Sequence, residues 1–149
     1  MKKRIIILDD ELLISALLKR VVEEEHELEI SGMTTDKDEF LNLVENNSFD
    51  MALIDISVGG RKGGFDILAK LKDKGINLPS IVLSAHDELD YALPCLKAGA
   101  KGYVNKLYIC TDLIPALKEV FYGNLFVSGD RGKHIIDQYR LNCLSEVNQ

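Results

Sequence analysis

The stretch Ile5-Ile6-Ile7-Leu8-Asp9-Asp10-Glu11 places three acidic residues directly after four apolar ones. A short, wholly apolar run is typical of a strand that is covered on both faces of a parallel sheet. Three further apolar runs are closely followed by a polar side chain: Asp55 after Met51–Ile54, Ser84 after Ile81–Leu83 and Lys106 after Tyr103–Val104. Because the carboxyl ends of parallel strands open on one edge of a sheet, we expect all these polar side chains to share one crevice.

Strand-like and helix-like segments alternate along the rest of the chain. The expected strands are Ile5–Leu8, Leu28–Met33, Met51–Ile56, Ser80–Ser84 and Gly102–Lys106. The expected helices are Glu11–Glu25, a helix capped by Asp36, Phe65–Lys74, Glu88–Lys97 with Pro94 inside it, and a helix from Thr111 to about Tyr122. Five such βα units in series predict an α/β fold, a doubly wound parallel sheet with helices on both faces.

The pattern changes after Gly123. Residues 124–132 are rich in turn formers, and four apolar residues then follow at helical spacing: Ile135, Ile136, Tyr139 and Cys143. We expect residues 1–123 to form one domain and residues 124–149 to form a linker or a C-terminal helical extension. A dimer contact and a lead-in to a further domain remain as alternatives for this extension.

Composition narrows the function classes. The chain has 149 residues, the size of one domain, and a formal net charge of −6. This charge gives no basic surface, so we expect these residues to contact neither nucleic acid nor membrane directly. Three cysteines at unpaired spacing, with no signal peptide and no apolar run of membrane-spanning length, favour a cytoplasmic protein with reduced thiols.

The residue types in the crevice suggest one chemistry. Carboxylates that lie close together repel, so they must keep protons or recruit a cation. Mg²⁺ prefers oxygen ligands and keeps water molecules that a phosphate oxygen can replace. A carboxylate can also attack phosphorus and form an aspartyl phosphate. The metal would neutralise one phosphate oxygen, Lys106 a second, and the Ser84 hydroxyl would hydrogen-bond the third.

At this point the chain resembles a known family, the receiver domains of response regulators. The matching segments are Ile-Leu-Asp-Asp-Glu (7–11), Leu-Ile-Asp-Ile (53–56), Val-Leu-Ser-Ala (82–85) and Ala-Gly-Ala-Lys-Gly-Tyr-Val-Asn-Lys (98–106). The resemblance covers roughly residues 2–122 and implies a flavodoxin-like fold with the strand order 2-1-3-4-5. It implies that Asp55 is the phosphoacceptor and that a sensor histidine kinase or phosphotransfer protein is the donor.

The resemblance also implies roles for the other residues of the crevice. Mg²⁺ would be bound by Asp55, by Asp10 directly, by Asp9 largely through water, and by the backbone carbonyl of Ser57. The phosphate contacts would come from Ser84 and Lys106. Ser84 and Tyr103 would be the switch residues, Tyr103 being the aromatic side chain that changes rotamer on activation.

Three features depart from the commonest receiver pattern. Leu107 stands where many receivers have a proline, which is similar to the LuxR-type, DNA-binding branch of the family, as is the stretch 121–128. The loop from Ile56 to Gly64 carries four glycines together with Arg61 and Lys62, and we expect a mobile loop with solvent-facing charges. His86 follows Ser84 by two residues, and we expect it at the surface, with an effect on dephosphorylation as the alternative.

We therefore expect a phosphorylation-controlled switch of a two-component system, not an enzyme beyond self-phosphorylation and autodephosphorylation at Asp55. Phosphorylation would change the surface formed by the fourth helix, fifth strand and fifth helix. The output would be transcription, through a DNA-binding domain outside this chain. The alternative is a stand-alone receiver or phosphorelay protein that acts by protein contact, and a homodimer is a further expected partner.

Two other classes share parts of this chemistry. Phosphohydrolases with an aspartyl nucleophile usually carry a second acid two residues later, where this chain has Ser57. Flavin carriers of the same topology place a phosphate loop after the first strand, where Asp9-Asp10-Glu11 would repel phosphate. Both classes are therefore disfavoured.

Overall fold

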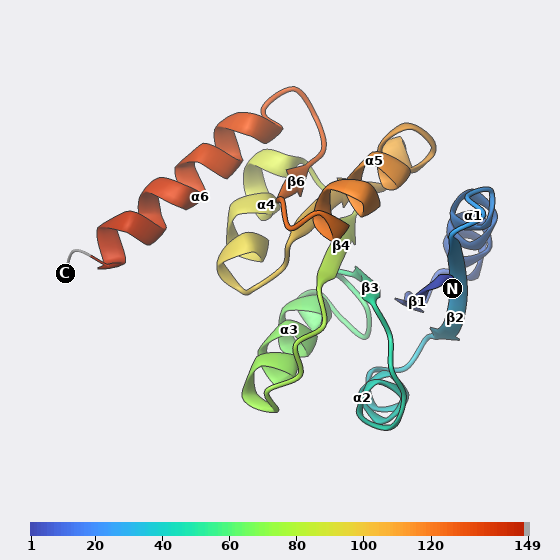
Figure 1. Ribbon diagram of the computed structural model, residues 1–149. Coiled ribbons are helices and arrows are strands. Elements are labelled where there is room, and N and C mark those ends of the chain that lie inside the picture. Colours follow the sequence, from blue (N-terminus) through green and yellow to red (C-terminus); the bar gives the residue numbers. More distant parts are fainter. Residues whose placement is uncertain (148–149) are drawn as a thin grey trace.

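The structure is a computed structural model that describes residues 1–147. Its centre is a six-stranded parallel sheet with the order β2-β1-β3-β4-β5-β6 (Figure 1). The strands are β1 (Lys3–Leu8), β2 (Leu28–Thr34), β3 (Met51–Asp55), β4 (Ser80–Ser84), β5 (Gly102–Asn105) and β6 (Phe126–Val127). The helices are α1 (Leu12–Glu23), α2 (Lys37–Asn46), α3 (Gly63–Asp73), α4 (Glu88–Lys97), α5 (Ile109–Phe121) and α6 (Gly132–Val147), with a 3₁₀ turn η1 (Lys106–Tyr108) before α5.

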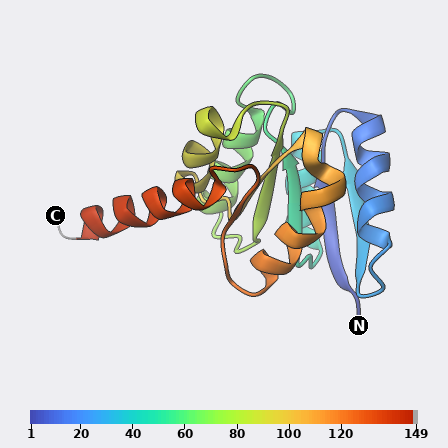
Figure 2. The ribbon, with the colours of Figure 1, turned by 90° about the horizontal axis from the view of Figure 1, so that it is seen from above.

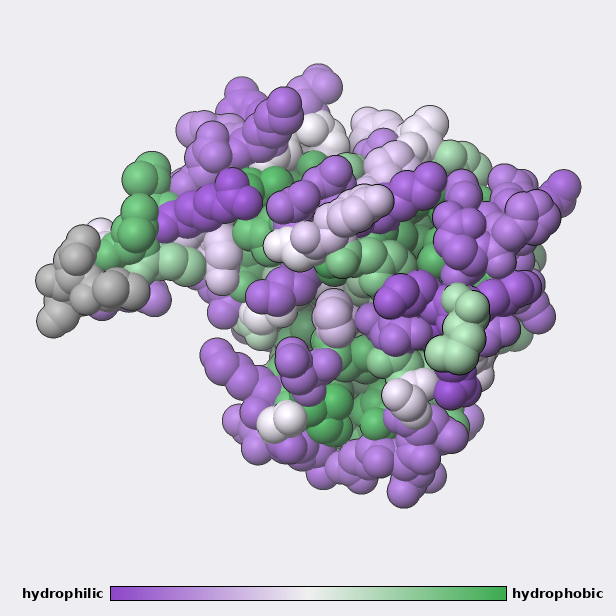
Figure 3. Space-filling model, in the orientation of Figure 1, coloured by the Kyte–Doolittle hydropathy of each residue, from purple (hydrophilic) through white to green (hydrophobic). Residues whose placement is uncertain are grey.

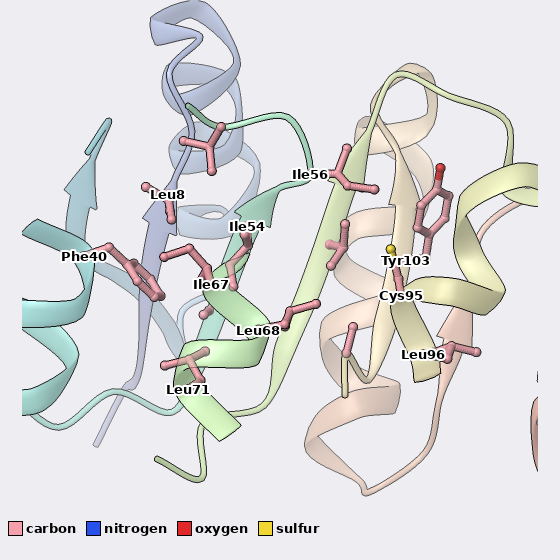
Figure 4. Packing of buried hydrophobic residues seen from close by; sticks show 14 of the residues in the cluster. Leu8, Phe40, Ile54, Ile56, Ile67, Leu68, Leu71, Cys95, Leu96 and Tyr103 are labelled. Carbon is pink, nitrogen blue, oxygen red and sulfur yellow. The ribbon is translucent and has the colours of Figure 1, made fainter. Parts of the chain in front are cut away.

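Helices cover both faces of the sheet, α1 and α5 one face and α2, α3 and α4 the other (Figure 2). The run Ile5–Leu8 shows why: Ile5 and Ile7 belong to the cluster under α1 and α5, while Ile6 and Leu8 belong to the opposite cluster. Successive side chains of a strand point to opposite faces, so a strand buried on both sides must be apolar throughout. Figure 4 shows the second cluster, with α3 packed over β1 and β3.

The predicted order 2-1-3-4-5 is confirmed, and a sixth strand extends it. Gly102 pairs with Phe126 and Tyr103 with Val127, so β6 lies parallel to β5 at the edge of the sheet. The sequence pattern does not predict this strand, because two residues are too few to show a period. The domain boundary after Gly123 remains a prediction. The last two residues of the predicted extension, 148–149, lie outside the described part of the chain.

Helix α5 begins earlier than expected. Thr111 was predicted as its N-cap, but α5 begins at Ile109 and the Thr111 hydroxyl donates a hydrogen bond to the Tyr108 carbonyl (3.3 Å). The reason is the side chain of Asn105, which accepts a hydrogen bond from the Leu107 N–H (2.9 Å) and starts a helical turn directly after β5. The predicted strand Gly102–Lys106 is therefore one residue too long, because Lys106 belongs to that turn and not to the strand.

The glycine-rich loop is closely packed where it enters α3. A Cβ atom on Gly63 would lie 1.5 Å from the Val58 carbonyl oxygen, and one on Gly64 would lie 2.7 Å from the Ile56 Cα. No other residue fits at these two positions without moving the backbone. The side chains of Arg61 and Lys62 are exposed, as predicted.

The C-terminal extension forms α6, and its two halves differ. Ile135, Ile136 and Tyr139 pack against the cluster that includes α4. The other half projects away from the body of the molecule (Figures 1 and 2). Leu141 and Leu144 are 65% and 60% exposed there, and Figure 3 shows apolar side chains gathered at this end. None of the helices in residues 1–147 combines the length and the hydropathy that spanning a membrane would require.

If β6 is an integral part of the sheet, replacing Ser128 by alanine will destabilise the protein. The buried Ser128 hydroxyl accepts a hydrogen bond from the Asn105 N–H (2.8 Å), and the change leaves that donor buried without a partner. We expect the free energy of unfolding to fall by about 1–3 kcal/mol in urea titrations. The matched control, S145A on exposed α6, should change it by less than about 0.5 kcal/mol. An equally small effect of S128A would contradict this role of β6.

Candidate functional site

Strand register brings the predicted polar residues to one edge of the sheet. Leu8 pairs with Ile54, so the residues that follow them, Asp9 and Asp55, lie side by side. Asp55 itself pairs with Leu83, the residue before Ser84. The crevice at this edge therefore contains Asp9, Asp55 and Ser84, and Lys106 reaches into it from the start of η1.

Lys106 is the positive centre of this crevice. Its ammonium nitrogen, Nζ, lies 3.3 Å from Asp9 Oδ2 and 3.3 Å from Asp55 Oδ1. The same nitrogen lies 2.5 Å from Oε1 of Glu11, at the start of α1. Burial lowers the pKa of Lys106, but Glu11, Asp55 and Asp9 more than offset this effect, so its pKa is raised above the ordinary value. The lysine therefore stays charged at neutral pH.

The two oxygens of the Asp55 carboxylate have different surroundings. Oδ1 accepts hydrogen bonds from the backbone N–H and the hydroxyl of Ser57, both at 3.2 Å. Oδ2 is buried and has no hydrogen-bond donor among the described residues. A buried carboxylate oxygen without a donor is unfavourable, which leaves this atom available to a ligand from outside the chain.

Asp9 is fully buried, and burial raises its pKa from 3.8 to about 6. The Glu11 N–H donates a hydrogen bond to Asp9 Oδ1 (2.8 Å) and lowers the pKa. The charge of Asp55 raises it again, and the Lys106 ammonium opposes that increase. The net result is a carboxylate that is costly to ionise in the metal-free protein.

The acidic residues of the crevice fit a hard cation. One carboxylate oxygen from each of Asp9, Glu11 and Asp55 lies within 4.8 Å of the other two, and Mg²⁺ prefers such ligands. Asp10, the predicted direct ligand, is exposed and is not one of these three residues, so its role stays a prediction. The Ser57 carbonyl, also predicted as a ligand, accepts a hydrogen bond from the Gly60 N–H (3.1 Å).

Glu11 is the site residue that sequence reasoning missed. The signal was present, because Glu11 is the third acid of the run that follows the first strand. Sequence alone did not show that its side chain turns back to Lys106, since the direction of a side chain at the start of a helix depends on the backbone there.

A chain of hydrogen bonds leads from the crevice to β5. Ser84 is fully buried, and its hydroxyl oxygen accepts a hydrogen bond from the His86 N–H (2.9 Å). The His86 carbonyl in turn accepts hydrogen bonds from the Tyr103 hydroxyl (2.8 Å) and from the Asn105 side chain (3.3 Å). The side chain of His86 is exposed, as predicted, but its backbone connects the two strands.

The same chain of contacts continues into the C-terminal extension. The Asn105 N–H donates to the Ser128 hydroxyl, and the Ser128 N–H donates to the Tyr103 carbonyl (2.9 Å). Tyr103 is fully buried, and Figure 4 shows its ring on the side of β5 that α4 covers, in the same cluster as Cys95 and Leu96 of α4. The predicted switch residues Ser84 and Tyr103 are thus connected through His86.

The fold and the crevice define a doubly wound α/β protein with an acidic, lysine-containing site at the carboxyl edge of its sheet. The family model for the response regulator receiver domain matches residues 5–118 of the chain. The chain therefore belongs to the response regulator receiver domain family, the phosphorylation-controlled switches of two-component systems.

Individual relatives agree with this assignment. The chain is 32% identical over 142 residues to the transcriptional regulatory protein DegU of Brevibacillus brevis, which covers 93% of this chain and 58% of that relative. The chain spans little more than half the length of the curated relatives it matches.

Two solved structures share the fold. A two-component response regulator of the LuxR family from Aurantimonas sp. SI85-9A1 superposes with a TM-score of 0.81 at 20% identity, covering 95% of this chain and 99% of that chain. The non-phosphorylated receiver domain of the stress response regulator RcsB from Escherichia coli gives 0.77 at 24% identity, covering 87% and 100%. The predicted flavodoxin-like fold and the similarity to LuxR-type receivers are confirmed.

The raised pKa of Asp9 predicts a specific pH dependence of stability. The folded protein holds the Asp9 proton more tightly than the unfolded chain, so ionisation removes stability as the pH rises from about 4 through about 6. Without divalent metal at pH 7.5, D9N should therefore be more stable than the native protein by about 2–3 kcal/mol.

Urea titrations in a chelating buffer at several pH values measure the difference in the free energy of unfolding between D9N and the native protein. This difference should shrink as the pH falls below 6, and added Mg²⁺ should stabilise the native protein more than D9N. The control D90N removes an exposed carboxylate on α4 and should show neither effect. A stability difference between D9N and the native protein that does not change with pH would contradict the argument.

Proposed function

We propose that Asp55 accepts a phosphoryl group from the phosphohistidine of a sensor kinase or phosphotransfer protein. The observation that carries this proposal is the buried Asp55 Oδ2, which has no donor among the described residues and belongs to a carboxylate paired with Lys106. In the transfer, an Asp55 oxygen forms the new bond to phosphorus and the bond from phosphorus to the histidine nitrogen breaks. The acyl phosphate later reacts with water, which returns Asp55 and releases phosphate.

Mg²⁺ is the cofactor we propose for this transfer. Asp9, Asp10, Asp55 and the Ser57 carbonyl would hold it, and Asp10 is free to turn inward because it is exposed and not fixed by packing. When bound, the metal supplies positive charge to the phosphoryl oxygens. It also offsets the cost of ionising Asp9 in a buried position.

Two side chains of the chain would contact the phosphoryl group itself. The Lys106 ammonium, already beside Asp55, would neutralise one oxygen. The Ser84 hydroxyl accepts a hydrogen bond from His86 and can donate its own proton to another phosphoryl oxygen. A shift of Ser84 toward phosphate would pull on His86 and, through it, on Tyr103 and Asn105.

The surface that responds would then include the C-terminal extension. The predicted output surface of α4, β5 and α5 is bordered here by β6, paired with β5, and by α6, packed near α4. We propose that the output is transcriptional, through a DNA-binding domain outside this chain, by analogy with DegU. The alternative is a stand-alone receiver or phosphorelay protein, in which the same surface binds a protein or a second copy of the chain.

The surroundings of the crevice suit a protein partner. Leu12 and Leu13 at the start of α1 are 73% and 87% exposed, and Leu107 in η1 is 81% exposed. These apolar side chains directly follow Glu11 and Lys106 in sequence. We propose that they contact the kinase or phosphotransfer protein. The three cysteines, all free, support a reducing compartment such as the cytoplasm.

Incubation with acetyl phosphate tests the proposal. With Mg²⁺, the native protein should gain the mass of one phosphoryl group, measured on the intact chain, and with excess EDTA it should gain none. D55N should gain none under either condition, because the amide is not a nucleophile toward phosphorus. The control D38N, which changes an exposed aspartate on α2, should behave like the native protein.

An equal adduct on D55N would remove Asp55 from this role. The number of turnovers separates a switch from a phosphohydrolase. We expect one phosphoryl group per chain and slow release of phosphate, not rapid hydrolysis of a panel of phosphate esters.

A further inference from the structure

Glu11 is the nearest acidic partner of Lys106. Its Oε1 lies 2.5 Å from the ammonium nitrogen, whereas the oxygens of Asp9 and Asp55 lie at 3.3 Å. The three carboxylates also differ in exposure: the Glu11 side chain is 55% exposed, and the other two are almost completely buried. Glu11 therefore approaches Lys106 from the solvent side, the side from which a phosphodonor must enter.

Helix capping does not explain a glutamate at this position. Glu11 is the N-cap residue of α1, and its side chain makes no capping hydrogen bond. Serine, threonine, aspartate and asparagine are the residues that stabilise such positions. The contact that this side chain does make is the ion pair with Lys106.

We propose that Glu11 is a positioning residue that holds Lys106 in the unphosphorylated protein and competes with the phosphoryl group for it. One carboxylate oxygen of Glu11 lies within 4.8 Å of an Asp55 oxygen, so a tetrahedral anion on Asp55 enters the region that Glu11 occupies. Two negative groups this close repel, and Glu11 must turn away to solvent. The inference rests on the function proposed above and adds to it an internal anion that opposes phosphorylation.

The test uses beryllofluoride, a tetrahedral analogue of the phosphoryl group, and the variant E11Q, which keeps the shape of the side chain and removes its charge. At fixed Mg²⁺ and low salt, calorimetry should show E11Q binding beryllofluoride about two- to fivefold more tightly than the native protein, since exposed ion pairs contribute energies of this order. With acetyl phosphate, the half-saturating donor concentration should fall while the rate at saturating donor changes less.

Salt provides a readout that a merely structural role of Glu11 would not move. Salt screens this ion pair through its exposed Glu11 partner, so the affinity ratio between E11Q and the native protein should move toward one as the ionic strength rises to about 1 M. The control E27Q makes the same change of charge at Glu27, an exposed residue directly before β2. The backbone carbonyl of Glu27 accepts a hydrogen bond from the Lys3 N–H at the start of β1. E27Q should bind beryllofluoride like the native protein at every salt concentration.

The outcomes separate this inference from the proposed function. If the native protein and E27Q bind beryllofluoride and E11Q binds it no more tightly, Glu11 does not compete for Lys106 and only the inference is overturned. If E11Q binds more weakly and requires more Mg²⁺, Glu11 is a metal ligand, and the inference is again overturned. If the native protein binds no beryllofluoride at all, the proposed function is overturned and the inference with it.

Discussion

The contact between the Lys106 ammonium and the buried carboxylates of Asp9 and Asp55 is the interaction on which the rest of the site depends. The register of β1 and β3 forces the two aspartates together at the edge of the sheet, where neither is solvated. Burying a charge is strongly unfavourable unless a partner is present, and one lysine cannot neutralise two carboxylates. Burial raises the pKa of Asp9, and the neighbouring charge of Asp55 adds to this effect. A divalent cation would offset both effects, which is the physical reason for proposing Mg²⁺ as the cofactor of this site.

Sequence predicted the part of the site that depends on backbone register. Asp55 and Ser84 are the last residues of buried strands, and Asp9 and Lys106 directly follow such strands. Parallel strands place their carboxyl ends together whatever the side chains do. Glu11 was missed and Asp10 lies exposed, because these two positions belong to the turn into α1, where the side-chain direction depends on tertiary contacts. The roles that the family resemblance gave to single residues remain predictions, since geometry alone does not show a ligand.

The difference between local pattern and tertiary contact also explains the errors in the predicted fold. Strands of four or more residues carry a clear pattern, and all five were found. Strand β6 has two residues and depends on two hydrogen bonds between residues that are more than twenty positions apart in sequence. The Asn105 N–H donates to the Ser128 hydroxyl, and the Ser128 N–H donates to the Tyr103 carbonyl. The start of α5 was placed at Thr111 because a threonine before a helical pattern resembles a cap, whereas the Asn105 side chain had already begun the turn. In both cases, tertiary contacts and not local propensity determined where the element begins or forms.

The direction of α6 follows from the same edge of the sheet. A Cβ atom on Gly132 would lie 2.0 Å from the Val127 carbonyl oxygen, so the first residue of α6 is wedged against β6. The first half of the helix packs near α4, but the projecting half is too short to be stable as an isolated helix in water. It is ordered by continuity with the attached half. In the proposed switch, a shift of Ser84 would therefore reach the base of α6 through His86, Asn105 and Ser128.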